Sequence, residues 1–209
     1  MSRISIGCIV EGKGEEYALP ILIERIAREV VPGVYVPVPR PVIVPRNHMT
    51  ASGDKVSNAI ELLLKRLSLP AGLLLVLDAD DDDPIELERA LAAHMRVCRS
   101  DVPSAVVVAC REYEAWFLAA AESLQRVRGL RNDLAAPPNP DAIRGAKEWL
   151  GDRAAGSTRY RPTADQAALT QSFDMTAARA NSPSFNRAYS EIERLLVELT
   201  ASPPATEMP

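Results

Sequence analysis

The sequence contains few of the residues that stabilise secreted or zinc-binding proteins. It has three cysteines and two histidines in 209 residues. The cysteines, Cys8, Cys98 and Cys110, are scattered and form no Cys-x-x-Cys pair, which excludes a disulfide framework and favours a reducing compartment. The two histidines, His48 and His94, are isolated from each other, which argues against a zinc site. We therefore expect a cytoplasmic protein.

Long apolar runs and an excess of basic charge are also missing. No run of about 18 apolar residues occurs, so the sequence predicts no membrane span. The first residues show no basic segment followed by an apolar one, and we expect no signal peptide. Lysine and arginine number 24 against 28 acidic residues, a formal charge of -4. This balance argues against a general nucleic-acid coat, while a local basic patch or a metal bridge to phosphate stays open.

Short apolar runs alternate with amphipathic segments over the first 130 residues. This order predicts an α/β fold with a mainly parallel sheet flanked by helices. Strands are expected at 4–10, 73–77 and 105–109, and the proline-rich segment 34–44 is expected to be an edge strand or an extended crossing. We expect an α/β domain at 1–130, a helical extension packed on it at 131–200, and a disordered tail at 201–209.

Helical periodicity and end signals place the helices. Helices are expected at 15–30, 55–67, 85–98, 112–128, 142–150 and 163–169, and from Ser182-Pro183 onward. Pro20 predicts a late start or a kink in the first helix, and residues 45–54 read as a polar loop. Capping boxes are expected at Asp83 with Glu86 and at Thr163 with Gln166.

Acidic residues follow two of the expected strands. Glu11 ends the first strand, and Asp78 and Asp80 follow the strand at 73–77. Because the carboxyl ends of parallel strands share one edge, these acids converge if the strands are neighbours, and Asp78 and Asp80 point to the same side while the chain stays extended. Such a cluster favours Mg²⁺ or Mn²⁺, with Glu15 and Asp82 as further ligands. The alternative is a solvated turn followed by a helix cap.

The spacing excludes three related phosphate or metal motifs. An EF-hand requires glycine where Asp83 stands, a P-loop requires serine or threonine soon after the lysine, and a dinucleotide fingerprint requires glycine at Tyr17.

Four segments in order carry a resemblance to a known family. The chain resembles the Toprim-like family called domain of unknown function 4276, which is related to the Toprim domains of topoisomerases, primases and OLD-type nucleases. The matching segments are Val10-Glu11-Gly12-Lys13-Gly14-Glu15-Glu16, Asp78-Ala79-Asp80, Arg111-Glu112-Tyr113-Glu114-Ala115-Trp116 and Ser182-Pro183-Ser184-Phe185.

The resemblance implies a Toprim-like, Rossmann-like fold with a Mg²⁺ or Mn²⁺ site on Glu11, Asp78 and Asp80. It implies a metal-dependent nuclease working with an AAA-type ATPase in defence; the alternative is a non-catalytic binding or regulatory partner of that ATPase. The nucleophilic tyrosine domain of topoisomerases is missing here, which points to hydrolysis by a metal-activated water or to no catalysis. Phosphoryl transfer to a small substrate is a third hypothesis, and enzymatic activity itself stays open.

Further residues are candidates by position. Glu11, Glu114 and Lys13 are the expected catalytic groups, and Glu112 and Glu114 either join the metal site or only favour a helix start. The expected nucleic-acid contacts, to DNA or RNA, are Arg46, His48, Arg111, Lys147, Arg159 and Arg161, with Ser157 and Thr158 beside the last two. Trp116 and Phe117 are expected in the core.

Overall fold

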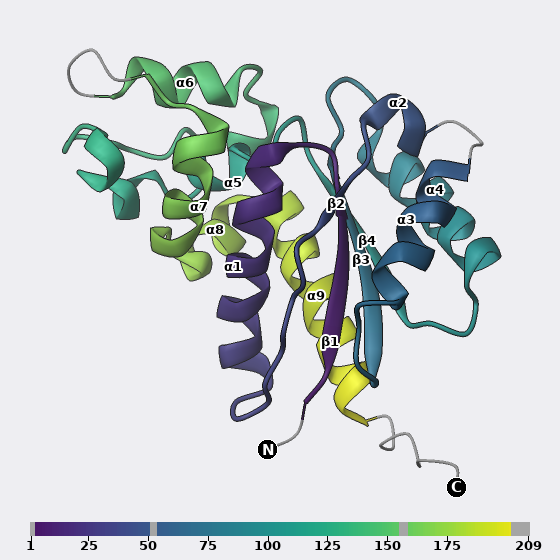
Figure 1. The fold of residues 1–209 in the computed structure, drawn as a ribbon. Helices are drawn as coiled ribbons and strands as arrows, with labels where there is room; N and C mark the ends of the chain where they lie inside the picture. Colours follow the sequence, from purple (N-terminus) through teal and green to yellow (C-terminus); the bar gives the residue numbers. More distant parts are fainter. Residues whose placement is uncertain (1–2, 51–53, 155–158, 202–209) are drawn as a thin grey trace, which may run out of the picture.

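The computed structural model describes residues 3–50, 54–154 and 159–201, and Figure 1 shows its arrangement. Its centre is a four-stranded, wholly parallel sheet in the order β2-β1-β3-β4. The strands are β1 (Ser5–Val10), β2 (Val42–Ile43), β3 (Ala71–Asp78) and β4 (Ser104–Ala109). The expected α/β class is therefore confirmed, and the three strongest apolar runs of the sequence lie next to one another.

Helices flank this sheet. The α-helices are α1 (Lys13–Val30), α2 (Arg46–Met49), α3 (Asp54–Leu64), α4 (Pro84–Cys98), α5 (Ala115–Leu118), α6 (Ala146–Asp152), α7 (Pro162–Ser172), α8 (Met175–Asn181) and α9 (Pro183–Ala201). Short 3₁₀ turns cover Ala121–Leu124, Val127–Gly129 and Pro140–Ala142. In the ranges described, no helix is both long enough and apolar enough to cross a membrane.

The alternation of side chains along the strands divides the core into two layers. Cys8 and Val107 face a cluster that includes the apolar faces of α1 and α9, whereas Ile9 and Val106 face α3 and α4. Figure 1 shows these helix pairs on opposite sides of the sheet. The helices after residue 130 share the first cluster with the strands. A domain boundary at 130 stays a prediction, and residues 202–209 of the expected tail lie outside the described ranges.

The first helix differs from expectation at Pro20. The helix begins early, at Lys13, and continues through Pro20. A proline there removes the hydrogen bond to the carbonyl four residues earlier. The helix nevertheless buries Leu19, Leu22 and Ile23 completely, and this burial outweighs one lost bond.

Two later expectations are also wrong. The supposed polar loop at 45–54 contains the short helix α2, and the expected helix at 112–128 is broken into α5 and two 3₁₀ turns. Positive φ angles at Arg126 and Arg128 interrupt the helix expected at 112–128. Residues 113–121 are all buried, and the ring centroids of Tyr113 and Trp116 lie 4.4 Å apart, so this stretch has no solvent-facing side of the kind that an amphipathic helix has.

The end signals of the helices were correct at one site and wrong at another. Asp83 caps α4 as expected, since its Oδ1 accepts hydrogen bonds from the backbone N–H of Ile85 (2.8 Å) and Glu86 (3.0 Å). At α7 the acceptor is Asp165, which bonds the backbone N–H of Arg161 at 2.9 Å, and the expected Thr163 box is not formed. Gly151 lies within α6 instead of ending it, and α8 was not expected.

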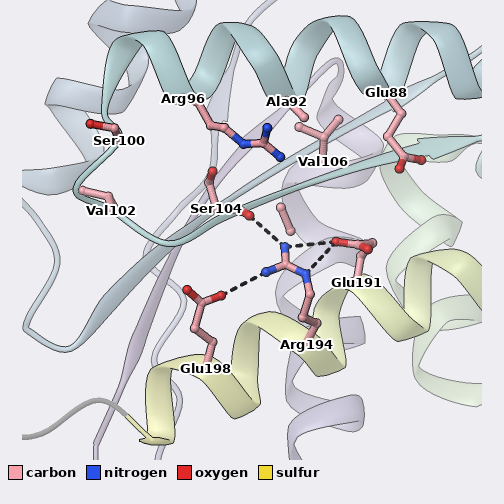
Figure 2. A pocket seen from close by; sticks show the side chains of 11 residues that line it. Glu88, Ala92, Arg96, Ser100, Val102, Ser104, Val106, Glu191, Arg194 and Glu198 are labelled. Atoms are coloured by element: carbon pink, nitrogen blue, oxygen red, sulfur yellow. Dashed lines mark hydrogen bonds and ion pairs between the residues drawn. The ribbon is translucent and has the colours of Figure 1, made fainter.

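The open edge of β4 is flanked by α4 and α9. Figure 2 shows the pocket at this edge, with Arg194 reaching from α9 toward the strand. The volume of the pocket is about 410 Å³. Its Nη2 donates to the carbonyl of Ser104 at 2.9 Å, while Glu191 and Glu198 hold the guanidinium. Arg194 therefore covers part of an edge that would otherwise present an unpaired carbonyl.

Candidate functional site

The carboxyl ends of β1, β3 and β4 meet at one edge of the sheet, and buried acids gather there. Asp78 ends β3, and its Oδ1 accepts a hydrogen bond of 2.8 Å from the backbone N–H of Tyr113, in the segment that follows β4. This bond ties the ends of two neighbouring strands together. Burial, and next the carboxylate of Glu114, raise the pKa of Asp78 well above its usual range.

A lysine from outside the sheet lies among these acids. The Nζ atom of Lys147, in the first turn of α6, lies 3.5 Å from Asp78 Oδ2, 3.2 Å from Glu112 Oε1 and 3.6 Å from Glu114 Oε2. Burial lowers the pKa of Lys147, but the carboxylates of Glu114, Asp78 and Glu112 raise it more, and the net direction is upward. The ammonium group therefore stays charged and supplies the positive charge that the cluster requires.

Glu114 is the most deeply buried of the acids. Its side chain is inaccessible to solvent, and its Oε1 accepts a hydrogen bond of 2.9 Å from the hydroxyl of Tyr160. Burial raises the pKa of Glu114 to about 7, although Lys147 and the Tyr160 bond lower it. A carboxyl group with this pKa can both accept and release a proton near neutral pH.

Glu11 and Glu15 approach the same point from β1 and α1. Burial raises the pKa of Glu11 while Arg46 lowers it, and the carboxylates of Asp80 and Glu15 raise it further. Glu15 is buried, and its Oε1 lies 3.5 Å from the amide nitrogen of Gln166 in α7. Glu15 therefore connects the acid cluster to the helices that follow residue 130.

Three buried side-chain atoms in the described ranges lack a hydrogen-bond partner, and all are oxygen acceptors of this region. They are Glu11 Oε2, Glu114 Oε2 and Gln166 Oε1. An unpaired buried acceptor is destabilising unless a donor or a cation satisfies it. The donor set is thus of the kind that a hard divalent cation prefers.

The aspartates after β3 do not point to the same side, which corrects the expectation from the sequence. Asp80 has a φ of 49°, so the chain leaves the extended conformation there. Its side chain is 59% exposed and lies 3.6 Å from Arg46, whereas that of Asp78 is 13% exposed and faces Lys147. Within 3–50, 54–154 and 159–201, no three His, Cys, Asp or Glu side chains converge closely enough to hold a metal ion together.

Arg46 holds the turn after β3. Its guanidinium donates to the carbonyls of Asp78 and Ala79 and lies 2.5 Å from Asp82 Oδ2. Asp82 is 62% exposed and is occupied by this ion pair. Arg46 therefore has a structural role in this arrangement, beside any contact with a ligand.

The other basic candidates lie on several different segments and do not form one cluster with the acids. Arg111 donates to the carbonyl of Asp80 at 2.9 Å and contacts Asp81. His48 on α2, Lys13 at the start of α1, Arg159 and Arg161 are exposed. Ser157 and Thr158 lie outside the described residues.

Sequence reasoning missed Tyr160 and Gln166, and it did not place Lys147 among the acids. These residues come from segments after 130 whose sequence contains no local signal for the site. The last motif has a structural role: Ser184 Oγ accepts bonds from Trp116 Nε1 (3.1 Å) and from the backbone N–H of Cys110 (2.9 Å). This contact joins two of the four motif segments. Trp116 and Phe117 are buried in the core, as expected.

The fold and these contacts define an α/β protein with a buried, lysine-neutralised acidic site at the carboxyl edge of a parallel sheet. The chain belongs to the family described as domain of unknown function (DUF4276), which matches residues 10–193. No curated protein matches it. Among solved structures, the C-terminal region of the OLD protein of Xanthomonas campestris pv. campestris is similar, at 15% identity and a TM-score of 0.42 over 97% of this chain and 99% of that one.

Proposed function

We propose that this chain hydrolyses phosphodiester bonds of DNA or RNA with Mg²⁺ or Mn²⁺ at the carboxyl edge of the sheet. The observation that carries the proposal is the group of buried carboxylates at this edge, on either side of β3. Glu11 Oε2 has no hydrogen-bond partner there, and Glu114 Oε2 has only the Lys147 ammonium, at 3.6 Å. Glu11 and Asp78 would hold the ion, with Glu15 as a further ligand, and Asp80 and Asp82 would join them only after leaving Arg46. A bound divalent cation supplies an activated water and positive charge for the phosphoryl oxygens.

The protein groups around this edge have distinct tasks in that reaction. Glu114, held by the Tyr160 hydroxyl, accepts a proton at its carboxylate because its pKa of about 7 matches neutral pH. Lys147 donates hydrogen bonds to phosphoryl oxygens and offsets the charge that develops on them. Lys13, exposed at the start of α1, adds positive charge at the entrance.

Cleavage assays with a matched pair of variants test the proposal. The protein is incubated with supercoiled plasmid and with single-stranded RNA, with Mg²⁺, with Mn²⁺ or with EDTA. Asp78→Asn is expected to reduce cleavage at least about 100-fold, and EDTA to abolish it. Asp133→Asn, an exposed aspartate paired with Arg131, serves as the control and should cut normally. Equal cutting by Asp78→Asn and the unaltered protein would remove the site from the reaction.

A second candidate function is a non-catalytic partner of an AAA-type ATPase. It is favoured by the position of Lys147, which already neutralises Asp78, Glu112 and Glu114 without a metal. Calorimetric titration with Mn²⁺ and co-purification with the ATPase separate the two candidates. Stable association without Mn²⁺ binding or cleavage would favour the partner role, whereas Mn²⁺ binding lost in Asp78→Asn would favour the nuclease.

A further inference from the structure

Two arginines from different segments contact one oxygen of an exposed aspartate beside the acidic site. Arg111 Nη1 lies 2.5 Å and Arg144 Nη1 lies 2.6 Å from the same atom, Asp81 Oδ1. The side chain of Asp81 is 68% exposed, so neither burial nor packing fixes it there. Guanidinium groups bind phosphate oxygens through the same kind of charge-assisted hydrogen bond.

A small cavity surrounds this contact. Its volume is about 140 Å³, and it lies between Asp80, Asp81, Arg111, Glu112, Arg144 and Gly145. A water molecule takes up roughly 30 Å³ of liquid, so the cavity has room for a phosphate group in place of several waters. Glu112 also contacts Lys147 at 3.2 Å, and the cavity therefore opens beside the acid cluster.

The backbone around the cavity is held in position before any ligand arrives. Arg111 has a φ of 65° and Asp80 a φ of 49°, conformations that non-glycine residues rarely adopt. Their backbones are joined by a hydrogen bond of 3.0 Å from Asp80 N–H to the Arg111 carbonyl, and Arg111 Nη1 donates back to the Asp80 carbonyl at 2.9 Å. Arg111 is thus oriented by the ends of β3 and β4, while the carboxylate it meets is exposed.

We propose that a backbone phosphate of the nucleic-acid strand displaces the Asp81 carboxylate and binds between Arg111 and Arg144. This inference rests on the proposed function and assigns it a substrate-positioning site. Asp81 competes with the strand as an internal anion, so that the two arginines exchange one anion for another. The bound phosphate places a neighbouring phosphodiester beside Asp78, Glu114 and Lys147.

The competition gives the two partners opposite effects on binding, which a binding assay can measure without cleavage. All proteins carry Asp78→Asn, and the probes are fluorescein-labelled single-stranded and duplex DNA, followed by anisotropy over a salt series. Arg144→Ala is expected to weaken binding about tenfold and to lower the slope of log K against log salt by about 0.7–0.9. Asp81→Asn is expected to tighten binding about three- to tenfold.

Two control variants remove one arginine and one acidic charge from a surface that is not part of the proposed site. Arg28→Ala and Glu24→Gln break an exposed ion pair on α1, where Arg28 lies in the last turn of the helix, away from the carboxyl edge. Figure 1 shows that end of α1 at the end of the sheet where β1 begins. These variants are expected to bind DNA as the parent does.

The outcomes separate this inference from the proposed function. If Arg144→Ala and Asp81→Asn bind like their controls while Asp78-dependent cleavage is observed, the inference is overturned and the nuclease stands. Weaker binding in Asp81→Asn would overturn the competition. If inorganic phosphate raises the Tm of the Asp81→Asn variant while the variant binds no DNA, the ligand of the two arginines is not a nucleic-acid strand, and the inference is overturned. Absence of both cleavage and binding overturns the two proposals together.

Discussion

The ammonium nitrogen of Lys147 lies 3.5 Å from Oδ2 of Asp78, so that a side chain of α6 neutralises the carboxylate that ends β3. Glu112 and Glu114, which follow β4, contact the same nitrogen. The acidic edge of the sheet is therefore completed by a residue far along the chain. A protein cation and a divalent metal ion are alternative ways to balance these charges.

Removing that cation should leave the acids in need of another one. Lys147→Met is expected to destabilise the protein in EDTA at pH 8 by about 1–2 kcal/mol, a value reduced for the partial exposure of the lysine. Mn²⁺ should then raise the Tm more in the variant than in the unaltered protein, because the unpaired carboxylates bind the ion more tightly. Thermal unfolding with and without Mn²⁺ measures this, and Lys13→Met is the exposed control. The same Mn²⁺ response in Lys147→Met and the unaltered protein would contradict the expectation.

Because the pKa of Glu114 is raised, replacing its carboxylate by a neutral side chain should stabilise the folded protein, and more so at high pH than at low pH. The pKa is about 7 in the folded protein against 4.5 for the free side chain, so the folded state binds more protons between these values and stability falls as pH rises through this window. Glu114→Gln is therefore expected to change stability little at pH 5 and to raise it by about 1–3 kcal/mol at pH 8. Urea unfolding in EDTA at both pH values checks this.

Asp101→Asn is the control for that experiment, because the pKa of Asp101 is lowered whereas that of Glu114 is raised. Hydrogen bonding from Arg99 lowers the pKa of Asp101 to about 2, so its stabilising effect is complete above the ordinary pKa of 3.8. The variant should lose the same stability at pH 5 as at pH 8. A Glu114→Gln effect that is likewise equal at the two pH values would contradict a raised pKa.

Ser184 is expected to be structural. Its hydroxyl oxygen accepts from Trp116 Nε1 and from the Cys110 backbone, and Ser184→Ala leaves both donors without an acceptor. We expect a loss of about 2–3 kcal/mol in urea unfolding. Ser172→Ala, which removes an exposed hydroxyl bonded to a carbonyl of its own helix, should change stability by less than about 0.5 kcal/mol. A loss from Ser184→Ala no larger than that of Ser172→Ala would refute this role.

Gly14 permits the close approach of α7 to α1. A β-carbon at Gly14 would lie 1.7 Å from Gln166 Oε1 and 3.1 Å from Pro162 Cβ. Gly14→Ala is expected to destabilise the protein by about 2–3 kcal/mol through overpacking. In the double variant with Gln166→Ala, the loss should be smaller than the sum of the single losses by at least about 1 kcal/mol.

A glycine with open space around it is the control for the comparison of Gly14→Ala, Gln166→Ala and the double variant. A β-carbon at Gly151, within α6, would meet its nearest neighbour at 3.9 Å, so Gly151→Ala should be neutral or slightly stabilising. Strict additivity of Gly14→Ala and Gln166→Ala in urea unfolding would show that the two positions do not compete for space.

Short sequence patterns correctly predicted the strands that are buried on both faces. The strands β1, β3 and β4 are buried on both faces, so each appears in the sequence as a continuous apolar run. The cap at Asp83 was also predictable, because its hydrogen bonds reach only two and three residues along the chain. The helix expected at 112–128 is not formed as one piece. Tyr113 packs against Trp116 and Phe117, and Trp116 also packs against Phe185, and a periodic pattern does not represent contacts of this kind.

The sequence by itself determined the family, the parallel α/β class, the position of Glu11 and Asp78 at strand ends, and the position of Glu114 shortly after β4. Only the tertiary structure decided that Lys147, Tyr160 and Gln166 meet those acids and that Asp80 turns away toward Arg46. The reason is that strand ends are specified by burial along a few consecutive residues. The partners of a buried charge depend on which distant segments pack over it, and no short stretch of chain encodes that contact.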